Sequence, residues 1–234
     1  MWPTLRALIN PYCHLCGELR SFVCDKLPLC QGCHEDLPWI DARCFCCGLP
    51  LERDATECGE CLQTRPHFNQ AAIPWSYEFP VANLITGFKH QQRHDHGALL
   101  ADLMGDFLLR HYYRMPWPQV LIPVPLHHSR RQQRGFNQAL EIAQRLGRYL
   151  HLPVLDDLLV RNRDTGSQQG LDRKQRQANL RDAFCCSGNT GFKRVAIIDD
   201  VVTTGSTVNS IALELQKQGI EDIHVWALAR TPKN

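Results

Sequence analysis

The sequence has no continuous apolar run of about 18 residues, roughly the length that a helix needs to cross a membrane. Residues 1–16 also lack the long apolar stretch of a secretory signal. These two absences argue against the membrane-spanning class, so we expect no membrane insertion and a cytoplasmic location. With 44% hydrophobic residues among 234, the chain is still able to bury a sizeable core.

The sequence also has little net charge. Its formal value of +2 at pH 7 is too small to indicate a nucleic-acid-binding protein by itself. The charge is uneven, however: residues 1–66 contain six Lys or Arg against nine Asp or Glu, a balance of −3, whereas residues 121–181 contain eleven against five, a balance of +6. A polyanion such as DNA is therefore expected to approach the middle of the chain.

Two common nucleotide-binding patterns are absent as well. Neither the triphosphate loop G-x-x-x-x-G-K-[ST] nor the dinucleotide fingerprint G-x-G-x-x-G occurs in the sequence. A phosphate ligand of this protein would therefore have to be held by another kind of loop.

Cysteine, by contrast, is abundant: the chain has twelve, and eight of them form four C-x-x-C pairs. In a reducing compartment this spacing favours metal ligands over disulfides. Gly17 and Gly48 follow two of the pairs at equivalent places, which indicates a duplicated zinc ribbon in residues 1–66. We predict two structural zinc ions, bound by Cys13, Cys16, Cys30, Cys33, Cys44, Cys47, Cys58 and Cys61.

The sequence leaves some alternatives for this module open. Iron or disulfides could replace zinc, Cys24 and Cys46 are left over, and Cys46 competes with Cys47 as a ligand. A site closed by four thiolates leaves no position for a substrate, so its role is structural. Because a zinc ion with four thiolates carries a formal charge of about −2, the acidic module would repel phosphates. This favours packing or partner docking over DNA binding.

The remainder, residues 67–234, repeats a pattern of strand, loop and helix. "VLIPVPL" is an apolar strand, "HHSRRQQRG" a polar loop, and "FNQALEIAQRLGRYL" has apolar residues at helical spacing. "RVAIID", "DVVTTGS" and "TVNSIALELQKQG" repeat the pattern before a last strand, "IHVWALAR". An earlier helix with a break between residues 87 and 97 is also expected. The nearly continuous apolar strands predict an α/β domain with a parallel sheet and helices on both faces.

The end of the strand "RVAIID" combines two carboxylates, Asp199 and Asp200, with a loop of Thr, Gly and Ser. Ligands of parallel α/β sheets bind at the carboxyl ends of the strands. The loop opens a helix, so its backbone N–H groups can receive a phosphate, and Gly205 permits close approach. The carboxylates suit the hydroxyls of a sugar, so we expect a ribose 5-phosphate here. The alternative is that the aspartates cap a turn and the loop is an ordinary helix start.

The run "VAIIDDVVTTGST" resembles the phosphoribosyl pyrophosphate (PRPP) signature of the type I phosphoribosyltransferases. The cysteine module, "IPVPL...RRQQRGFNQALEIA" and "RNRDTGSQQGLDRKQRQANLRDAF" follow one another in an order that resembles the ComF family of competence-related proteins over essentially the whole chain. The resemblance implies a type I phosphoribosyltransferase-like sheet preceded by the double zinc ribbon. It also implies PRPP as ligand and a Mg²⁺ ion bridging its pyrophosphate and ribose hydroxyls.

The same resemblance implies roles for individual residues. The two aspartates would hold the ribose hydroxyls, and residues 203–207 would grip the 5-phosphate. Lys89 in "GFKHQQ" is similar to a family lysine, with a solvated surface lysine as the equal alternative, and residues 70–97 would stand where other phosphoribosyltransferases have a hood over the acceptor. The implied PRPP site comprises Lys89, Val124, Pro125, Leu126, Arg134, Arg161, Gln168, Asp199, Asp200, Thr203, Thr204, Gly205, Ser206 and Thr207.

Members of the ComF family are associated with natural transformation, the handling of incoming single-stranded DNA and the use of DNA as a nutrient. We expect a PRPP-binding protein in this role, with single-stranded DNA and competence proteins as partners. The alternative is an active phosphoribosyltransferase of nucleotide salvage with an unidentified base acceptor; no residue is an obvious general base, so no catalytic residue is assigned. Phe136 would stack on DNA or belong to the core. The candidate DNA contacts, which would alternatively serve pyrophosphate, are Arg130, Arg131, Arg173, Lys174, Arg176 and Arg181.

Overall fold

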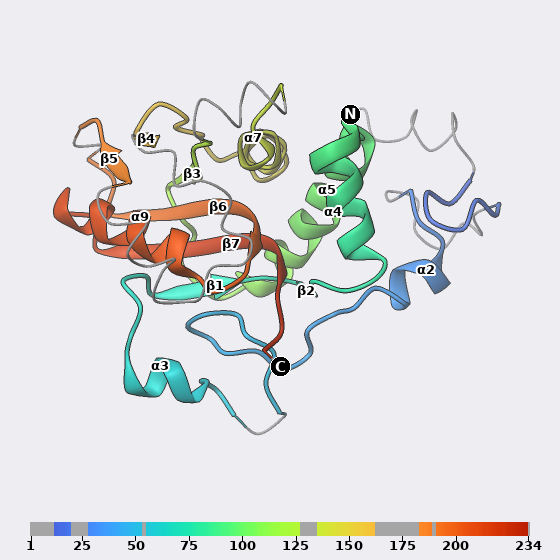
Figure 1. Ribbon diagram of the computed structural model, residues 1–234, viewed down its shortest axis with the longest axis horizontal. Helices are drawn as coiled ribbons and strands as arrows, with labels where there is room; N and C mark the ends of the chain where they lie inside the picture. Colours follow the sequence, from blue (N-terminus) through green and yellow to red (C-terminus); the bar gives the residue numbers. More distant parts are fainter. Residues whose placement is uncertain are drawn as a thin grey trace.

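The centre of the protein is a five-stranded sheet in which the described strand pairings are all parallel. The computed structural model describes residues 12–19, 28–52, 55–126, 135–161, 183–188 and 191–233. The strands are β1 Gln70–Ala72, β2 Trp75–Ser76, β3 Val120–Pro123, β6 Arg194–Val202 and β7 Asp222–Arg230. Their order is β1, β7, β6, β3, and β2 also pairs with β7 (Figure 1).

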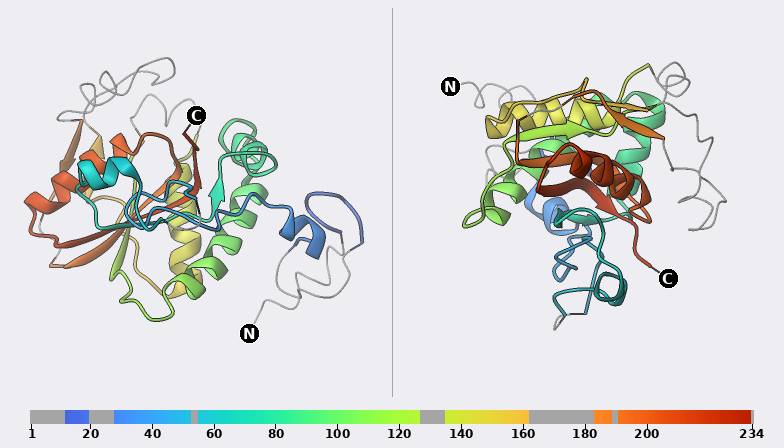
Figure 2. Two further views of the ribbon diagram at one scale, coloured as in Figure 1. Left: turned by 90° about the horizontal axis from the view of Figure 1, so that it is seen from below. Right: turned by 90° about the vertical axis from the view of Figure 1, so that its left-hand side faces the viewer.

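Helices cover both faces of this sheet, as Figure 1 and Figure 2 show. They are α4 Val81–Gln91, α5 His94–His111, α7 Gln138–Leu150 and α9 Ser206–Lys217. Ala196 and Ile198 of β6 belong to the core that α4, α5 and α7 share, whereas Val195 and Ile197 belong to the core beneath α9. Alternate residues of one strand thus enter two cores, as a strand buried on both faces requires. The predicted α/β fold with a doubly covered parallel sheet is confirmed.

Local sequence signals explain where the helices begin and end. α7 starts after Asn137, whose side-chain oxygen accepts a hydrogen bond from the Ala139 N–H at 3.1 Å and so satisfies a free donor of the first turn. α4 and α5 are separated at Gln92, which adopts a left-handed backbone with φ of 53°. The helix break expected between residues 87 and 97 is therefore confirmed.

Strand β6 is longer than the sequence predicted. The expected strand "RVAIID" ended at Asp199, but β6 continues to Val202 and includes Asp200. The reason is its neighbour β7: Val201 and Val202 are in register with Ala229 and Arg230, and the Val202 side chain is buried. The two aspartates therefore belong to a strand, not to the turn that the alternative interpretation required.

A second, two-stranded sheet was not predicted. β4 (Leu159–Arg161) and β5 (Phe184–Cys186) pair antiparallel. Leu159 and Phe184 are buried in the core beneath α9. Three-residue strands give too short a pattern for sequence periodicity to detect.

The cysteine-rich segment packs directly against the sheet. It contains the short helices α2 (Gln31–Glu35) and α3 (Gly59–Gln63), which Figure 1 places far apart, with α3 below the sheet and α2 near the lower end of α4. The Ile40 N–H donates to the Pro74 carbonyl at 2.9 Å, and the Ala71 N–H donates to the Phe45 carbonyl at 3.1 Å. The rings of Trp39 and Trp75 lie 5.2 Å apart. These contacts attach the segment to the chain that forms β1 and β2.

Within the residues that the structure describes, no helix combines the length and the apolar character needed to cross a membrane.

Candidate functional site

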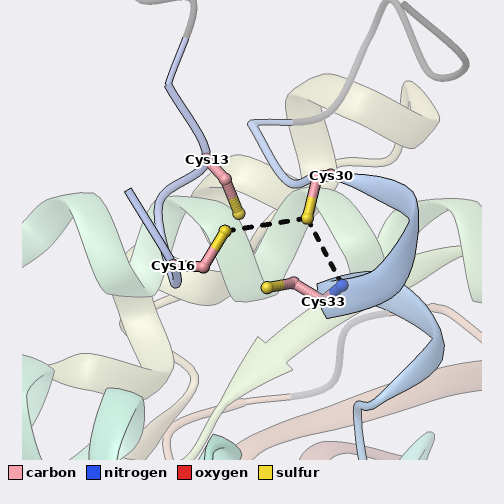
Figure 3. A group of neighbouring side chains, drawn as sticks. All are labelled: Cys13, Cys16, Cys30 and Cys33. Carbon is pink, nitrogen blue, oxygen red and sulfur yellow. Dashed lines mark hydrogen bonds between the residues drawn. The ribbon is translucent and has the colours of Figure 1, made fainter. Parts of the chain in front are cut away.

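The eight cysteines predicted as ligands form two clusters. They are Cys13, Cys16, Cys30 and Cys33 in the first, and Cys44, Cys47, Cys58 and Cys61 in the second, with all ligand atoms of a cluster within 4.8 Å of one another. Figure 3 shows the first cluster, in which two side chains come from one turn and two from the start of α2. Each cluster therefore combines two of the four C-x-x-C pairs found in the sequence.

The sulfur separations fit zinc better than disulfides. The Cys16 and Cys30 sulfurs lie 3.8 Å apart and those of Cys47 and Cys58 lie 3.7 Å apart. A tetrahedron with Zn–S bonds of about 2.3 Å places its sulfurs about 3.8 Å from one another, whereas a disulfide requires about 2.05 Å. Cys46 is buried but does not belong to the second cluster. Of the two competing residues, Cys47 is therefore the candidate ligand. Cys24 lies outside the described residues.

Backbone N–H groups surround the sulfurs. The N–H of Cys58 donates to the sulfur of Cys44 at 3.3 Å, and the N–H of Cys33 donates to that of Cys30 at 3.5 Å. Although burial alone would raise the pKa of the Cys13 thiol, hydrogen bonds from Cys16, Cys30 and Leu15 lower that pKa to about 6. Such donors favour the thiolate, which is the form that binds a metal.

The paired aspartates lie near the carboxyl end of β6, and a lysine from α4 reaches them. Lys89 Nζ lies 2.8 Å from Asp200 Oδ2, with the two side chains 18% and 13% exposed. Lys89 is therefore not the solvated surface lysine that the sequence left as an equal alternative. The N–H of Asp200 donates to Asp199 Oδ1 at 2.9 Å, which fixes the neighbouring carboxylate.

The environment of Asp199 opposes its ionisation. Burial, followed by the negative charge of Asp200, raises the pKa of the Asp199 carboxyl to about 8, while Lys89 and the Asp200 N–H act in the opposite direction. Two carboxyls this close disfavour a second negative charge. Perturbed pairs of this kind are common at binding sites, and a cation or a hydroxyl-bearing ligand would stabilise the ionised form.

The loop that follows β6 leads into α9 through Gly205. This glycine has φ of 77°, a left-handed conformation that glycine adopts at low cost, and α9 begins at Ser206. The hydroxyl oxygens of Thr204 and Ser206 lie 2.9 Å apart. With Thr203 and Thr207, the loop offers hydroxyls and the N–H groups of a helix start, although the Ser206 N–H donates to Thr204 Oγ1 at 3.4 Å; such a set of donors suits an anion.

The segment after β3 lies beside the aspartates. The N–H of Val124 donates to the carbonyl of Ile198 at 2.9 Å, which places Val124 next to Asp199 on the neighbouring strand. Asn137 donates from Nδ2 to the Val124 carbonyl at 3.1 Å. The segment Val124, Pro125 and Leu126, which the resemblance includes in the PRPP site, therefore starts beside the carboxylate pair.

The other predicted site residues are placed differently. Arg161 is in β4, where its guanidinium lies 5.5 Å from the centre of the Phe184 ring. Phe136 packs on Phe88 and His94 with ring separations of 5.3 Å and 4.7 Å, which agrees with a core role. The remaining predicted residues lie outside the part of the chain that the structure describes: Arg130, Arg131, Arg134, Gln168, Arg173, Lys174, Arg176 and Arg181.

Comparison with known proteins identifies the family. No family model matches the chain. Competence protein F of Haemophilus influenzae, however, is 38% identical over 212 residues, which cover 88% of this chain and 91% of that protein. The chain belongs to the competence protein F, or ComF, family. The family resemblance of its motifs is thereby confirmed.

Other members of this family carry related names. DNA utilization protein YhgH of Shigella flexneri is 34% identical and covers 87% of this chain and 90% of its own length, and Competence protein ComFC of Streptococcus pneumoniae is 26% identical over 93% of this chain and 99% of its own. Among solved structures, the crystal structure of a purine phosphoribosyltransferase from Pyrococcus horikoshii Ot3 matches 56% of this chain and 80% of its own at 21% identity, with a TM-score of 0.32.

Two residues that donate hydrogen bonds to the backbone of the candidate site, Asn137 and Arg230, were not predicted from the sequence. Asn137 was only part of the segment expected to be helical, and nothing in the pattern revealed its bond to Val124. Arg230, at the end of β7, is 3% exposed and donates to the carbonyls of Val202 and Thr203, just before the loop. Its one signal is a charged residue directly after the apolar run from Val225 to Ala229.

Proposed function

We propose that the protein binds PRPP with Mg²⁺ at the carboxyl end of β6. The observation that carries the proposal is the carboxylate pair Asp199 and Asp200, of which Asp200 is paired with Lys89, followed by a helix start rich in hydroxyls. The proposed role is cytoplasmic handling of incoming single-stranded DNA during natural transformation or DNA utilisation. The names of the relatives, Competence protein F and DNA utilization protein YhgH, support this role.

The donors at the site match the parts of the ligand. The carboxylates of Asp199 and Asp200 accept hydrogen bonds from the two ribose hydroxyls, which are charge-assisted and therefore strong. Residues 203–207 hold the 5-phosphate with backbone N–H groups and hydroxyls. Carboxylate oxygens also suit Mg²⁺, which when bound neutralises charge on the pyrophosphate.

Lys89 has a separate task in this proposal. In the free protein its ammonium neutralises Asp200, at a distance of 2.8 Å. When PRPP and Mg²⁺ bring their own charges, Lys89 is released from part of this interaction and can turn to the anionic ligand. Arg134, Arg161 and Gln168 remain proposed ligand contacts, and the basic residues from Arg130 to Arg181 remain proposed DNA contacts.

An active phosphoribosyltransferase of nucleotide salvage is the second candidate. The segment Val124, Pro125 and Leu126 favours it, because it starts beside Asp199 and would hold the pyrophosphate that leaves during transfer. In this case the ligand site is the same, and an acceptor base attacks the anomeric carbon through a transition state that is stabilised electrostatically.

The test incubates metal-loaded protein with PRPP, Mg²⁺ and a panel of nucleobases, and measures ligand binding and pyrophosphate release in parallel. Saturable binding without release supports the first candidate, and release with one base supports the second. The variant D199N/D200N is the control, since neutral amides lose the charge-assisted bonds. Equal binding by this variant and the wild type would overturn the assignment of the site.

A further inference from the structure

Arg230 joins the second cysteine cluster to the loop of the proposed ligand site. Its Nε donates to the carbonyl of Cys47 at 3.1 Å. Its Nη1 donates to the carbonyls of Val202 and Thr231, each at 3.1 Å, and to that of Thr203. The Arg230 guanidinium therefore binds the turn that carries Cys44 and Cys47 through Nε, and the entrance of the loop after β6 through Nη1.

The guanidinium is buried, and its described partners are carbonyl oxygens. Arg230 is 3% exposed. A buried arginine loses its hydrogen bonds when its partners move, because no water replaces them. The Arg230 side chain is therefore a rigid connection between the carbonyl of Cys47 and the carbonyls of Val202 and Thr203.

The two ends of this connection are the turn that carries Cys44 and Cys47 and the loop after β6. The turn from Cys44 to Gly48 is closed by the bond from the Gly48 N–H to the Cys44 carbonyl at 2.8 Å, and its two cysteines would be fixed by a metal. The loop at residues 203–205 has no helix or strand of its own between β6 and α9. The Val202 carbonyl also accepts a hydrogen bond from the Thr231 N–H at 3.0 Å, whereas Arg230 is the described donor to the Thr203 carbonyl inside the loop.

We propose that Arg230 is a positioning residue that couples metal binding at the second cysteine cluster to the order of residues 203–207. A metal on Cys44 and Cys47 fixes the Cys47 carbonyl, this carbonyl orients the guanidinium, and the guanidinium holds the loop entrance. Loss of the metal from this cluster then loosens the loop and lowers its affinity for a phosphate group. The part about affinity rests on the proposed PRPP function, whereas the part about loop order does not.

The first cluster provides the internal comparison. It lies against other elements: Cys13 belongs to the core formed with α4 and α5, and His14 Nε2 lies 3.0 Å from Asp95 Oδ2 at the start of α5. Cys30 and Cys58 are matched positions, since each precedes a five-residue helix as its N-cap. Cys58→Ser is expected to speed amide exchange at residues 203–207, and Cys30→Ser is not.

Arg43 provides a second matched control. Its guanidinium also ties the cysteine-rich segment to the chain beside β1, by donating to the carbonyls of Ile73 at 2.7 Å and of Ile40. It makes no described hydrogen bond with the loop after β6. Arg43→Met therefore removes another anchor of the cysteine-rich segment, one that makes no described contact with the loop.

The experiment measures hydrogen exchange at residues 203–207 and zinc content in the full-length protein, followed by PRPP·Mg²⁺ affinity. Arg230→Met is expected to keep both metals, to speed exchange at the loop by about tenfold and to weaken PRPP binding by about tenfold, the size of a lost hydrogen bond to a charged group. Arg230→Lys keeps the charge but not the fork of donors, so it should behave like Arg230→Met.

The outcomes separate the two proposals. If the wild type does not bind PRPP, the proposed function fails, and the exchange data still decide the coupling. Loop exchange in Arg230→Met or Arg230→Lys that equals the wild type would overturn the coupling. The same conclusion would follow if Cys30→Ser and Arg43→Met loosened the loop as much as Cys58→Ser and Arg230→Met.

Discussion

At the scale of single residues, Asp199 has the most unusual environment in the described site. Its carboxyl lies beside Asp200, and burial and that second charge raise its pKa to about 8. In the unfolded chain an aspartate has a pKa of about 3.9. Between these two pH values the folded protein therefore holds a proton that the unfolded protein has released, and the stability contributed by this group falls as pH rises through that window.

Asp199→Asn removes this pH dependence. The variant should melt at about the wild-type temperature near pH 4, and at a temperature higher by about 5 °C near pH 8.5, because an amide bears no charge to bury. Thermal unfolding without ligand, recorded from pH 4 to pH 9, gives the difference. A melting-temperature difference that shrinks as pH rises would contradict the environment described for Asp199.

The ion pair of Lys89 and Asp200 gives the second prediction at this scale. Lys89→Met should lower the free energy of unfolding by about 2 kcal/mol, since the Asp200 carboxylate is left partly buried without its cation. In the double variant with Asp200→Asn this loss should be smaller, with a coupling energy of about 1 kcal/mol in a double-mutant cycle. Urea denaturation measures all four proteins.

The control for this cycle is an exposed ion pair. Lys193 and Glu221 are 2.8 Å apart with side chains 65% and 72% exposed, so Lys193→Met should cost little. A coupling energy for Lys89 and Asp200 no larger than that of the exposed pair would show that Lys89 does not stabilise the carboxylate.

At the scale of elements, the sequence was sufficient where the signal is local. The loop around Gly205, the helical spacing of α7 and the C-x-x-C pairs are all contained in short windows, and each is found where it was predicted. β6 exceeds its predicted end because its pairing with β7, and not its own pattern, decides where it stops. β1 and β2, within the segment expected to form a hood, also depend on β7 for pairing.

Contacts between distant elements could not be predicted from pattern or spacing, and only the family resemblance placed Lys89 in the same site as the aspartates. The bond of Lys89 to Asp200 joins α4 to β6, and that of Arg230 to Cys47 joins β7 to the cysteine-rich segment. A single sequence carries no periodicity or spacing that relates such residues, because their proximity is a result of the tertiary fold.

The cysteine clusters yield a prediction at the same scale. The purified protein should contain close to two zinc ions, and Cys30→Ser and Cys58→Ser should each retain about one, because three thiolates bind zinc less tightly than four. Elemental analysis of freshly purified protein measures the metal. Protein without zinc, or a single substitution that removes both ions, would contradict two independent sites.

At the scale of the whole molecule, the packing of the cysteine-rich segment decides how DNA binding can be tested. Deleting this segment would remove two hydrogen-bond acceptors, the Phe45 carbonyl for the Ala71 N–H and the Cys47 carbonyl for Arg230. A shortened protein would therefore lose contacts that support its sheet. A change of surface charge in the full-length chain is the cleaner experiment. Arg130 and Arg131 are suitable targets for such a change. The described chain before them follows β3 at the carboxyl edge of the sheet, beside Asp199, and the described chain after them resumes at Gly135, before α7.

Arg130→Ala with Arg131→Ala should weaken binding of single-stranded DNA and flatten its salt dependence, by about 0.7 in slope for each phosphate group that the variant no longer neutralises. The matched control is Arg110→Ala with Arg114→Ala, which removes the same charge from exposed positions around the end of α5. There Tyr112 contacts His224, near the start of β7, so the control lies toward the opposite edge of the sheet. If PRPP and DNA share the basic residues, PRPP should also displace DNA from the wild type, and by reciprocity DNA should weaken PRPP binding. Titrations of each protein with single-stranded DNA at two salt concentrations measure these affinities. Equally weakened binding in both double variants would mean that only net charge matters, and the basic residues from Arg130 to Arg181 would not be the DNA contact.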